Sequence, residues 1–240
     1  MLIDAKKCIG CGQCTYYCPV KAISVDAELK KARVDLDECV ECGACLRSKA
    51  CPVDALYEQE LSWPRTVRKV LSDPLTVAVE TGIPGRGTEE MKTNDVTGRF
   101  KRGYAGVAIE LGRPLLGARF RDVEKVARAM ARFGVEFEKL NPTTSLMEDK
   151  KTGKFKDDVL NEKVLSAIVE FAIPLEKLSD VLYALERVSH DVETVFSVDV
   201  CSRCNDDGSI PHEEILSKGN WWHSINVKTN VGLGRPRVSD

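Results

Sequence analysis

The sequence predicts an α+β protein built from two domains and a tail. Eight of its ten cysteines lie between Cys8 and Cys51, which sets off a small cysteine-rich domain over residues 1–60. Further along, two stretches with apolar residues at helical spacing each lie between apolar, strand-like stretches, which predicts a β-α-β-β-α-β domain over residues 65–205. Residues 206–240 form the predicted C-terminal tail.

The composition is that of a globular protein, and 240 residues leave room for two domains. The 35 Lys and Arg residues against 37 Asp and Glu residues give a net charge of −2, so we expect no nucleic-acid partner. No apolar run reaches the ~18 residues of a membrane span, and the cysteine at position 8 leaves no space for a signal peptide. We therefore expect a cytoplasmic protein with no membrane partner.

The cysteine-rich segment is an internal repeat. Each copy reads C-x2-C-x2-C and ends on a fourth cysteine followed by proline. The first copy contains Cys8, Cys11, Cys14 and Cys18, and the second contains Cys39, Cys42, Cys45 and Cys51. In a reducing compartment such cysteines indicate metal binding, and sets of four thiolates suit iron–sulfur clusters. Gly10, Gly12 and Gly43 give the backbone the freedom to turn tightly around a cluster. A pair of zinc sites fits this spacing poorly.

These residues closely resemble the bacterial-type ferredoxins that carry two 4Fe-4S clusters, over about the first sixty residues. In that family the fourth cysteine of each run binds the other cluster. The resemblance therefore implies one cluster held by Cys8, Cys11, Cys14 and Cys51, and another held by Cys39, Cys42, Cys45 and Cys18. The chain departs from the simplest pattern because five residues precede Cys51 where three precede Cys18. Such a short segment has little core of its own, so the clusters should supply much of its folding energy.

The second domain is predicted to begin near residue 65, after Trp63-Pro64. Residues 75–81 read as a strand, and residues 82–103 as a glycine-rich loop. Apolar stripes predict helices over 120–133 and 175–188. The predicted strands flanking these helices are 106–114, 135–140, 166–174 and 192–200. This order predicts a plait, with two helices on one face of an antiparallel sheet, and is similar at this level to ACT domains. Residues 148–158 read as an exposed charged loop.

Two further features are candidates for binding sites. The basic, glycine-rich stretch 82–121 could dock a partner, cradle a small anion, or be a plain solvated loop. Cys201 and Cys204 could bind zinc with His212 and His223, share a metal between two chains, form a redox pair, or simply pack. Trp221-Trp222 should be buried against the second domain or in a subunit interface, which would make the protein a homo-oligomer.

Clusters with four cysteine ligands leave no open coordination position, which favours electron relay over Lewis-acid chemistry. We therefore expect an iron–sulfur electron-transfer protein, the ferredoxin-like subunit or partner of a larger redox enzyme rather than a catalyst by itself. The alternative is an iron–sulfur regulatory or small-anion-binding protein with an ACT-like domain. A stand-alone reductase is disfavoured because no nicotinamide or flavin fingerprint is present.

Overall fold

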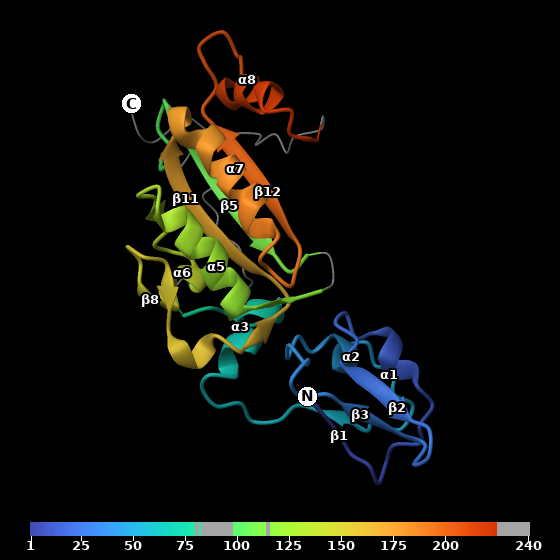
Figure 1. Cartoon of the computed structure of the whole chain (residues 1–240). Coiled ribbons are helices and arrows are strands. Elements are labelled where there is room, and N and C mark those ends of the chain that lie inside the picture. The colour runs from blue at the N-terminus through green and yellow to red at the C-terminus, as the bar shows by residue number, and fades with distance from the viewer. Residues whose placement is uncertain (80–81, 83–97, 114–115, 225–240) are drawn as a thin grey trace.

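The computed structural model describes residues 1–79, 82, 98–113 and 116–224, and Figure 1 shows a small N-terminal domain beside a larger one. Two separate apolar cores correspond to these parts, one formed by residues up to Leu56 and the other by residues from Val67 onward. Within the described residues, no helix is long and apolar enough to cross a membrane.

The N-terminal domain is built from two similar halves. Its elements are β1 (Leu2–Ile3), α1 (Gln13–Tyr16), β2 (Ile23–Asp26), β3 (Lys31–Val34), α2 (Ala44–Arg47) and β4 (Leu56–Tyr57). β1 pairs with β4 and β2 pairs with β3, both antiparallel. The pairing of the first strand with the last brings the two ends of the repeat together, so the two cysteine runs face a shared interior.

The larger domain contains a four-stranded antiparallel sheet in the order β12-β5-β11-β7. Its strands are β5 (Tyr104–Leu111), β7 (Glu136–Phe137), β11 (Ala167–Pro174) and β12 (Phe196–Ser202). Two helices, α5 (Phe120–Ala131) and α7 (Leu178–Ser189), lie side by side across one face of this sheet (Figure 1). The first helix begins at Phe120 as predicted, and the second is preceded by the short turn η2 (Leu175–Lys177).

The core of the larger domain lies between this sheet and the two helices. Alternate residues of β5 and β11 face the helices, and Val107, Ile109, Val169 and Phe171 are all at most 1% exposed. The apolar face of α5 packs against these strand residues, and its Met130 is fully buried. Burial of this stripe, not helix propensity, is what holds such short helices in place.

Smaller elements extend the larger domain. They are α3 (Thr66–Ser72), β6 (Ala118–Arg119), α6 (Pro142–Ser145), β8 (Met147–Asp149), β9 (Lys154–Phe155), η1 (Asp157–Val159), β10 (Lys163–Val164) and α8 (Pro211–Lys218). α3 lies at the junction of the two domains, whereas α8 lies at the far end of the molecule (Figure 1). α8 falls in the predicted tail, and Pro211 at its first turn and Lys218 in its last turn are sequence signals for it.

Two sequence predictions for this domain are wrong. The predicted strand over 75–81 instead begins as a turn around Asp73. The carboxylate of Asp73 accepts hydrogen bonds from the backbone N–H of Leu75 and from the hydroxyl of Thr76. Residues 80–81 lie outside the described residues. The predicted exposed loop over 148–158 instead contains the β8–β9 hairpin. Phe155 in this hairpin is fully buried, with its ring 5.3 Å from that of Phe120. The backbone N–H of Phe155 also donates to Glu124 of α5 at 2.7 Å, so this segment is fixed to the core.

Candidate iron–sulfur centre

The two cysteine runs turn in the same way. In each run the glycine between the second and third cysteines, Gly12 or Gly43, caps a one-turn helix with a positive φ, of 75° and 68° respectively. This left-handed conformation is one that glycine adopts without steric cost. The one-turn helix that follows each glycine buries the third cysteine of its run, Cys14 or Cys45.

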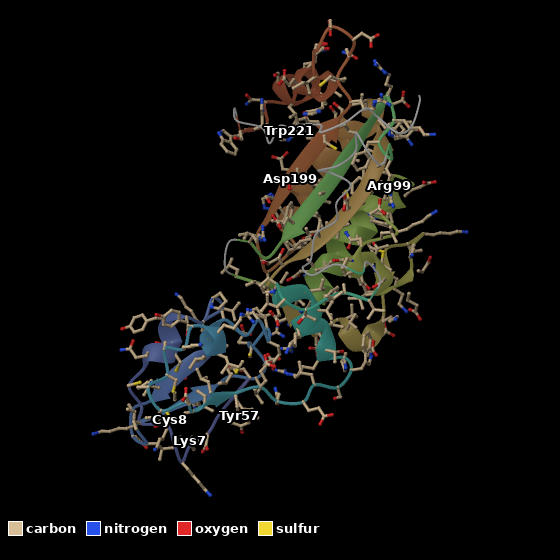
Figure 2. The ribbon with its side chains drawn as sticks, turned by 180° about the vertical axis from the view of Figure 1, so that it is seen from behind. Lys7, Cys8, Tyr57, Arg99, Asp199 and Trp221 are labelled. Carbon is tan, nitrogen blue, oxygen red and sulfur yellow. The ribbon has the colours of Figure 1, made fainter. Side chains whose placement is uncertain are left out.

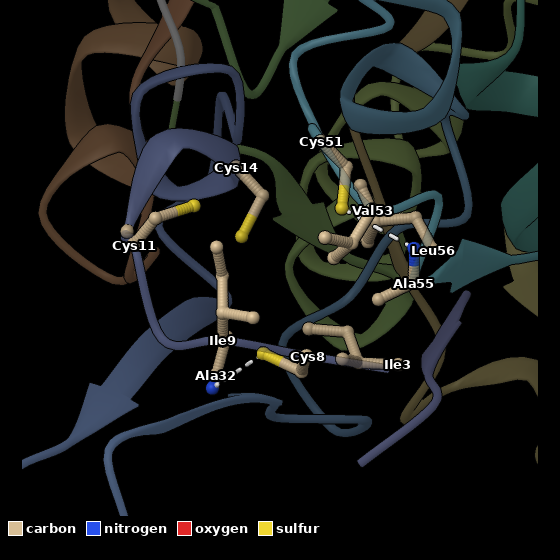
Figure 3. A pocket seen from close by; sticks show the side chains of 11 residues that line it. Ile3, Cys8, Ile9, Cys11, Cys14, Ala32, Cys51, Val53, Ala55 and Leu56 are labelled. Carbon is tan, nitrogen blue, oxygen red and sulfur yellow. Dashed lines mark hydrogen bonds between the residues drawn. The ribbon is translucent and has the colours of Figure 1, made fainter. Parts of the chain in front are cut away.

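The first cavity brings together cysteines from both copies of the repeat. Cys8, Cys11 and Cys14 of the first copy and Cys51 of the second line a space of about 330 Å³. Figure 3 shows their sulfur atoms directed toward a common space between apolar side chains, among them Ile3. Cys8 and Cys14 are buried, whereas Cys11 is exposed, so this cavity approaches the protein surface at Cys11.

The second cavity has the reciprocal composition. Cys39, Cys42 and Cys45 of the second copy and Cys18 of the first line a space of about 310 Å³. Its remaining walls are largely apolar. The five residues that precede Cys51 do not prevent it from reaching the first cavity: α2 is as long as α1, and the turn between α2 and Cys51 takes up the two extra residues.

Backbone amides approach three of the sulfur atoms. The N–H of Ala32 points to Cys8 Sγ at 3.3 Å, that of Ala55 to Cys51 Sγ at 3.2 Å, and that of Ala22 to Cys18 Sγ at 3.1 Å. Figure 3 shows the first two as dashed lines. Such donors stabilise negative charge on sulfur, and hydrogen bonds to sulfur are one of the factors that set the potential of an iron–sulfur cluster.

Burial raises the pKa of several of these thiols. The pKa of Cys14, Cys39 and Cys42 is raised above its ordinary value, and that of Cys45 is raised to about 12, in each case mainly because burial disfavours the charged thiolate. Neighbouring cysteines add to the shift. Four thiolates in one apolar cavity are therefore stable only with a bound cation, since coordination to a metal deprotonates a thiol outright. Four sulfur donors, apolar walls and amide donors fit a 4Fe-4S cluster.

The two runs differ in charge at the position before their second cysteine. Gly10 of the first run (φ 69°) corresponds to Glu41 of the second, which keeps the same left-handed backbone (φ 55°). A side chain at Gly10 would collide with the carbonyl oxygen of Lys30, 2.1 Å from an added Cβ. Glu41 is buried and forms ion pairs with Arg65 at 2.6 Å and with the amino group of Met1. This site therefore adds an anion, balanced by two cations, to the edge of the second cavity.

A cysteine-lined pair of cavities in a small two-fold repeat defines an iron–sulfur protein domain. Residues 7–70 match the family of the 4Fe-4S dicluster domain. This part of the chain is accordingly a dicluster ferredoxin domain, and it carries iron–sulfur clusters. The matches leave the rest of the chain unassigned, and no solved structure matches the chain.

Relatives match this same part. A protein of Geobacter metallireducens named NADH-quinone oxidoreductase subunit I 2 is 38% identical over 58 residues, which cover 21% of this chain and 43% of that protein. Pyruvate synthase subunit PorD of Methanothermobacter marburgensis is 37% identical over 54 residues, 22% of this chain and 58% of that subunit. PorD of Methanocaldococcus jannaschii is 36% identical over 55 residues, 23% of this chain and 60% of that subunit. The chain thus spans between two fifths and three fifths of the length of the relatives it matches.

The structure does not assemble the second cysteine pair into a metal site. Among the described residues, no three His, Cys, Asp or Glu side chains are placed to hold a single metal ion. Cys201 is packed against Gly106 of β5, where burial raises the pKa of its thiol to about 12, whereas Cys204 is exposed. The ring of His212 lies 2.7 Å from the hydroxyl of Ser202, and that of His223 faces the carbonyl of Trp221.

Much of the basic stretch 82–121 is engaged within the molecule. Arg99 pairs with Glu138, and Arg102 pairs with Asp206 at 2.7 Å. Arg113 pairs with Glu110 of β5 at 2.8 Å, and Arg119 pairs with two carboxylates of the N-terminal domain. Arg99 lies over the face of the sheet opposite the two helices (Figure 2). Residues 83–97 and 114–115 of this stretch lie outside the described residues.

The two tryptophans of the predicted tail have different surroundings. The ring of Trp221 packs on that of Tyr183 of α7, with 4.7 Å between the centroids. Trp222, by contrast, is 91% exposed. The expected burial against the second domain therefore holds for Trp221 only.

Proposed function

We propose that the eight cysteines of the N-terminal domain bind two 4Fe-4S clusters with crossed ligands. Cys8, Cys11, Cys14 and Cys51 hold the first cluster, and Cys18, Cys39, Cys42 and Cys45 hold the second. The observation that carries this assignment is the composition of the two cavities, each lined by three cysteines of one copy and one of the other. Each crossing ties one half of the repeat to the other.

We further propose that this chain relays single electrons as a cytoplasmic subunit or partner of an oxidoreductase. Bound clusters supply one-electron redox chemistry, and complete thiolate ligation leaves their iron closed to substrate. The chain itself buries Cys8, Cys14, Cys39 and Cys45 and exposes Cys11, which offers a point of electron entry or exit. Relatives named as subunits of NADH-quinone oxidoreductase and of pyruvate synthase support this role.

The larger domain supports a binding role for the rest of the chain. Its strand order β12-β5-β11-β7, with α5 and α7 on one face, supports the inference that it is a β-α-β-β-α-β plait. Plaits serve many functions, so the fold alone selects no ligand. We assign to this domain the docking of the ferredoxin domain within a larger assembly.

Anaerobic purification of the full chain from its native host tests this proposal. Iron and sulfide should each approach about eight per chain, as two cubane clusters require, and untagged oxidoreductase subunits should co-purify. The alternative, a regulatory protein with an ACT-like domain, predicts instead that the isolated chain melts at a higher temperature when a small anion is added. A chain that retains no iron would exclude both readings.

A further inference from the structure

Arg68 of α3 carries a buried positive charge onto the backbone of the second cysteine run. The residue is 3% exposed. Its Nη1 donates to three carbonyl oxygens, those of Leu36 (3.1 Å), Asp37 (2.7 Å) and Cys39 (2.9 Å). Its Nε donates to Glu162, in the larger domain. The guanidinium is therefore fixed between a cluster-binding loop and the larger domain.

A second arginine contacts the same run. Arg47 of α2 donates to the carbonyl of Cys42 at 2.6 Å and to Asp73, at the end of α3, at 2.9 Å. Arg47, which is exposed, and the buried Arg68 are together termed the arginine clasp, and they place two cations on ligand-bearing backbone. Both cations are held by carboxylates on or near the larger domain.

The first run has a weaker counterpart of this arrangement. There Lys31 of β3 donates to the carbonyl of Cys8, the position equivalent to Cys39. Lys31 is half-buried and belongs to the N-terminal domain itself, whereas Arg68 is anchored by the packing of α3. Val67 and Leu71 of that helix are buried in the core of the larger domain. The near-symmetric repeat is therefore charged asymmetrically.

We propose that the arginine clasp raises the reduction potential of the cluster in the second cavity above that of the cluster in the first. This inference rests on the proposed function. Reduction adds one electron from an external one-electron donor and one negative charge, and no proton is needed. A fixed positive charge stabilises that added charge more strongly inside a protein than in water. The electron therefore rests in the cavity beside the larger domain, and the first cavity serves as the relay toward the surface at Cys11.

Substituting each partner of the Arg68–Glu162 ion pair in turn distinguishes an effect of charge on the potential from an effect of lost packing. Arg68→Met removes the cation and should lower the potential of the second cluster, while Glu162→Gln removes its counter-anion and should raise it. Loss of packing alone would move both variants in the same direction. Lys31→Met is the matched control for the first run, and its effect should be smaller because water screens a half-buried charge.

The measurement is a redox titration of the full-length holoprotein followed by electron paramagnetic resonance. The redox transition that is lost in the Cys18→Ser variant is assigned to the second cluster. For Arg68→Met we expect the distribution of one electron between the clusters to shift at least tenfold toward the first, about 59 mV for a one-electron couple. Arg68→Lys keeps the positive charge, so the distribution of the electron should stay close to that of the unaltered protein. Glu162→Gln should shift the distribution toward the second cluster.

Two results would overturn the inference. One is a pair of unchanged potentials in variants that keep full iron; the other is a shift of the same sign in Arg68→Met and Glu162→Gln. If Arg68→Met fails to load iron, Glu162→Gln and Arg68→Lys decide the matter, since both keep the buried hydrogen-bonding groups. If the unaltered chain holds no clusters, the proposed function itself is wrong, and the iron and sulfide assay shows this before any titration.

Discussion

Arg119 of β6 lies 2.7 Å from the carboxylate of Asp37, across the junction between the two domains. The same guanidinium lies 2.7 Å from Glu38, which also pairs with Lys163 of β10. Both cations are only 15% exposed at the side chain. The loop that precedes Cys39 is thus held in two ways, by the arginine clasp and by this ion-pair network with the larger domain.

Arg119→Ala should loosen the junction without unfolding either domain. The carboxylates of Asp37 and Glu38 are accessible to solvent, and ion pairs that water reaches are each worth about 0–1 kcal/mol. The melting temperature should therefore change little while the relative motion of the domains increases. Limited proteolysis of the connecting residues 58–64 should be faster, and high salt should produce the same effect in the unaltered protein. Arg132→Ala, at the exposed position that directly follows α5, is the control. Equal cleavage rates in the two variants would contradict this role of Arg119.

Met130→Asp should unfold the larger domain. Met130 is fully buried, and an unpaired carboxylate at such a position costs about 4 kcal/mol or more. Thermal unfolding followed by circular dichroism measures the effect. Arg121→Asp places the same side chain at an exposed position of α5 and should leave the transition nearly unchanged. A Met130→Asp protein that melts cooperatively at the usual temperature would show that this face is not core.

The docking of α8 should weaken in mild acid. Burial lowers the pKa of His212, an effect that His223 reinforces and Glu213 opposes. An unfolded segment therefore binds a proton near pH 6.5 while the docked one resists it, so the stabilisation is present above that pH and declines below it. Hydrogen exchange of α8 between pH 5 and 7 measures this. His212→Asn should remove the pH dependence, whereas the same substitution at His190 should keep it.

Cys201→Ser with Cys204→Ser should leave both clusters in place. Burial raises the pKa of Cys201 to about 12, so its thiol stays protonated near neutral pH and should alkylate slowly. The exposed Cys204 should react first. Iron and sulfide assays on the double variant should match those of the unaltered chain. Loss of about four irons would reveal an additional cluster and extend the electron path into the larger domain.

The sequence predicted most of the features that depend on short, regular patterns. The cysteine spacing predicted two similar turns, whereas the resemblance to the dicluster ferredoxins predicted which cysteines would meet in each cavity. The apolar stripe from Phe120 to Met130 predicted α5, since helical periodicity is strong over several turns.

Features that depend on single long-range contacts could not be predicted. Phe155 anchors a charged segment that reads as solvent-exposed, through contacts with Phe120 and Glu124, which both lie more than thirty positions away in the chain. Arg68 stands in an ordinary helical sequence, and its contact with Cys39 arises only when α3 packs on the larger domain. In the basic stretch, Arg99 and Arg119 form ion pairs with acidic residues far away in the chain. The local net charge therefore overstated the positive charge that is available to bind a partner.

The most direct test of the account is Cys18→Ser in the full chain, purified anaerobically and studied by electron paramagnetic resonance. Cys18 lies in the first run, but its sulfur lines the cavity of Cys39, Cys42 and Cys45. We predict that this substitution damages the cluster of the second cavity and preserves the signal of the first. Loss of the cluster bound by Cys8, Cys11 and Cys14 instead would show that each run binds its own cluster and would contradict the crossed arrangement.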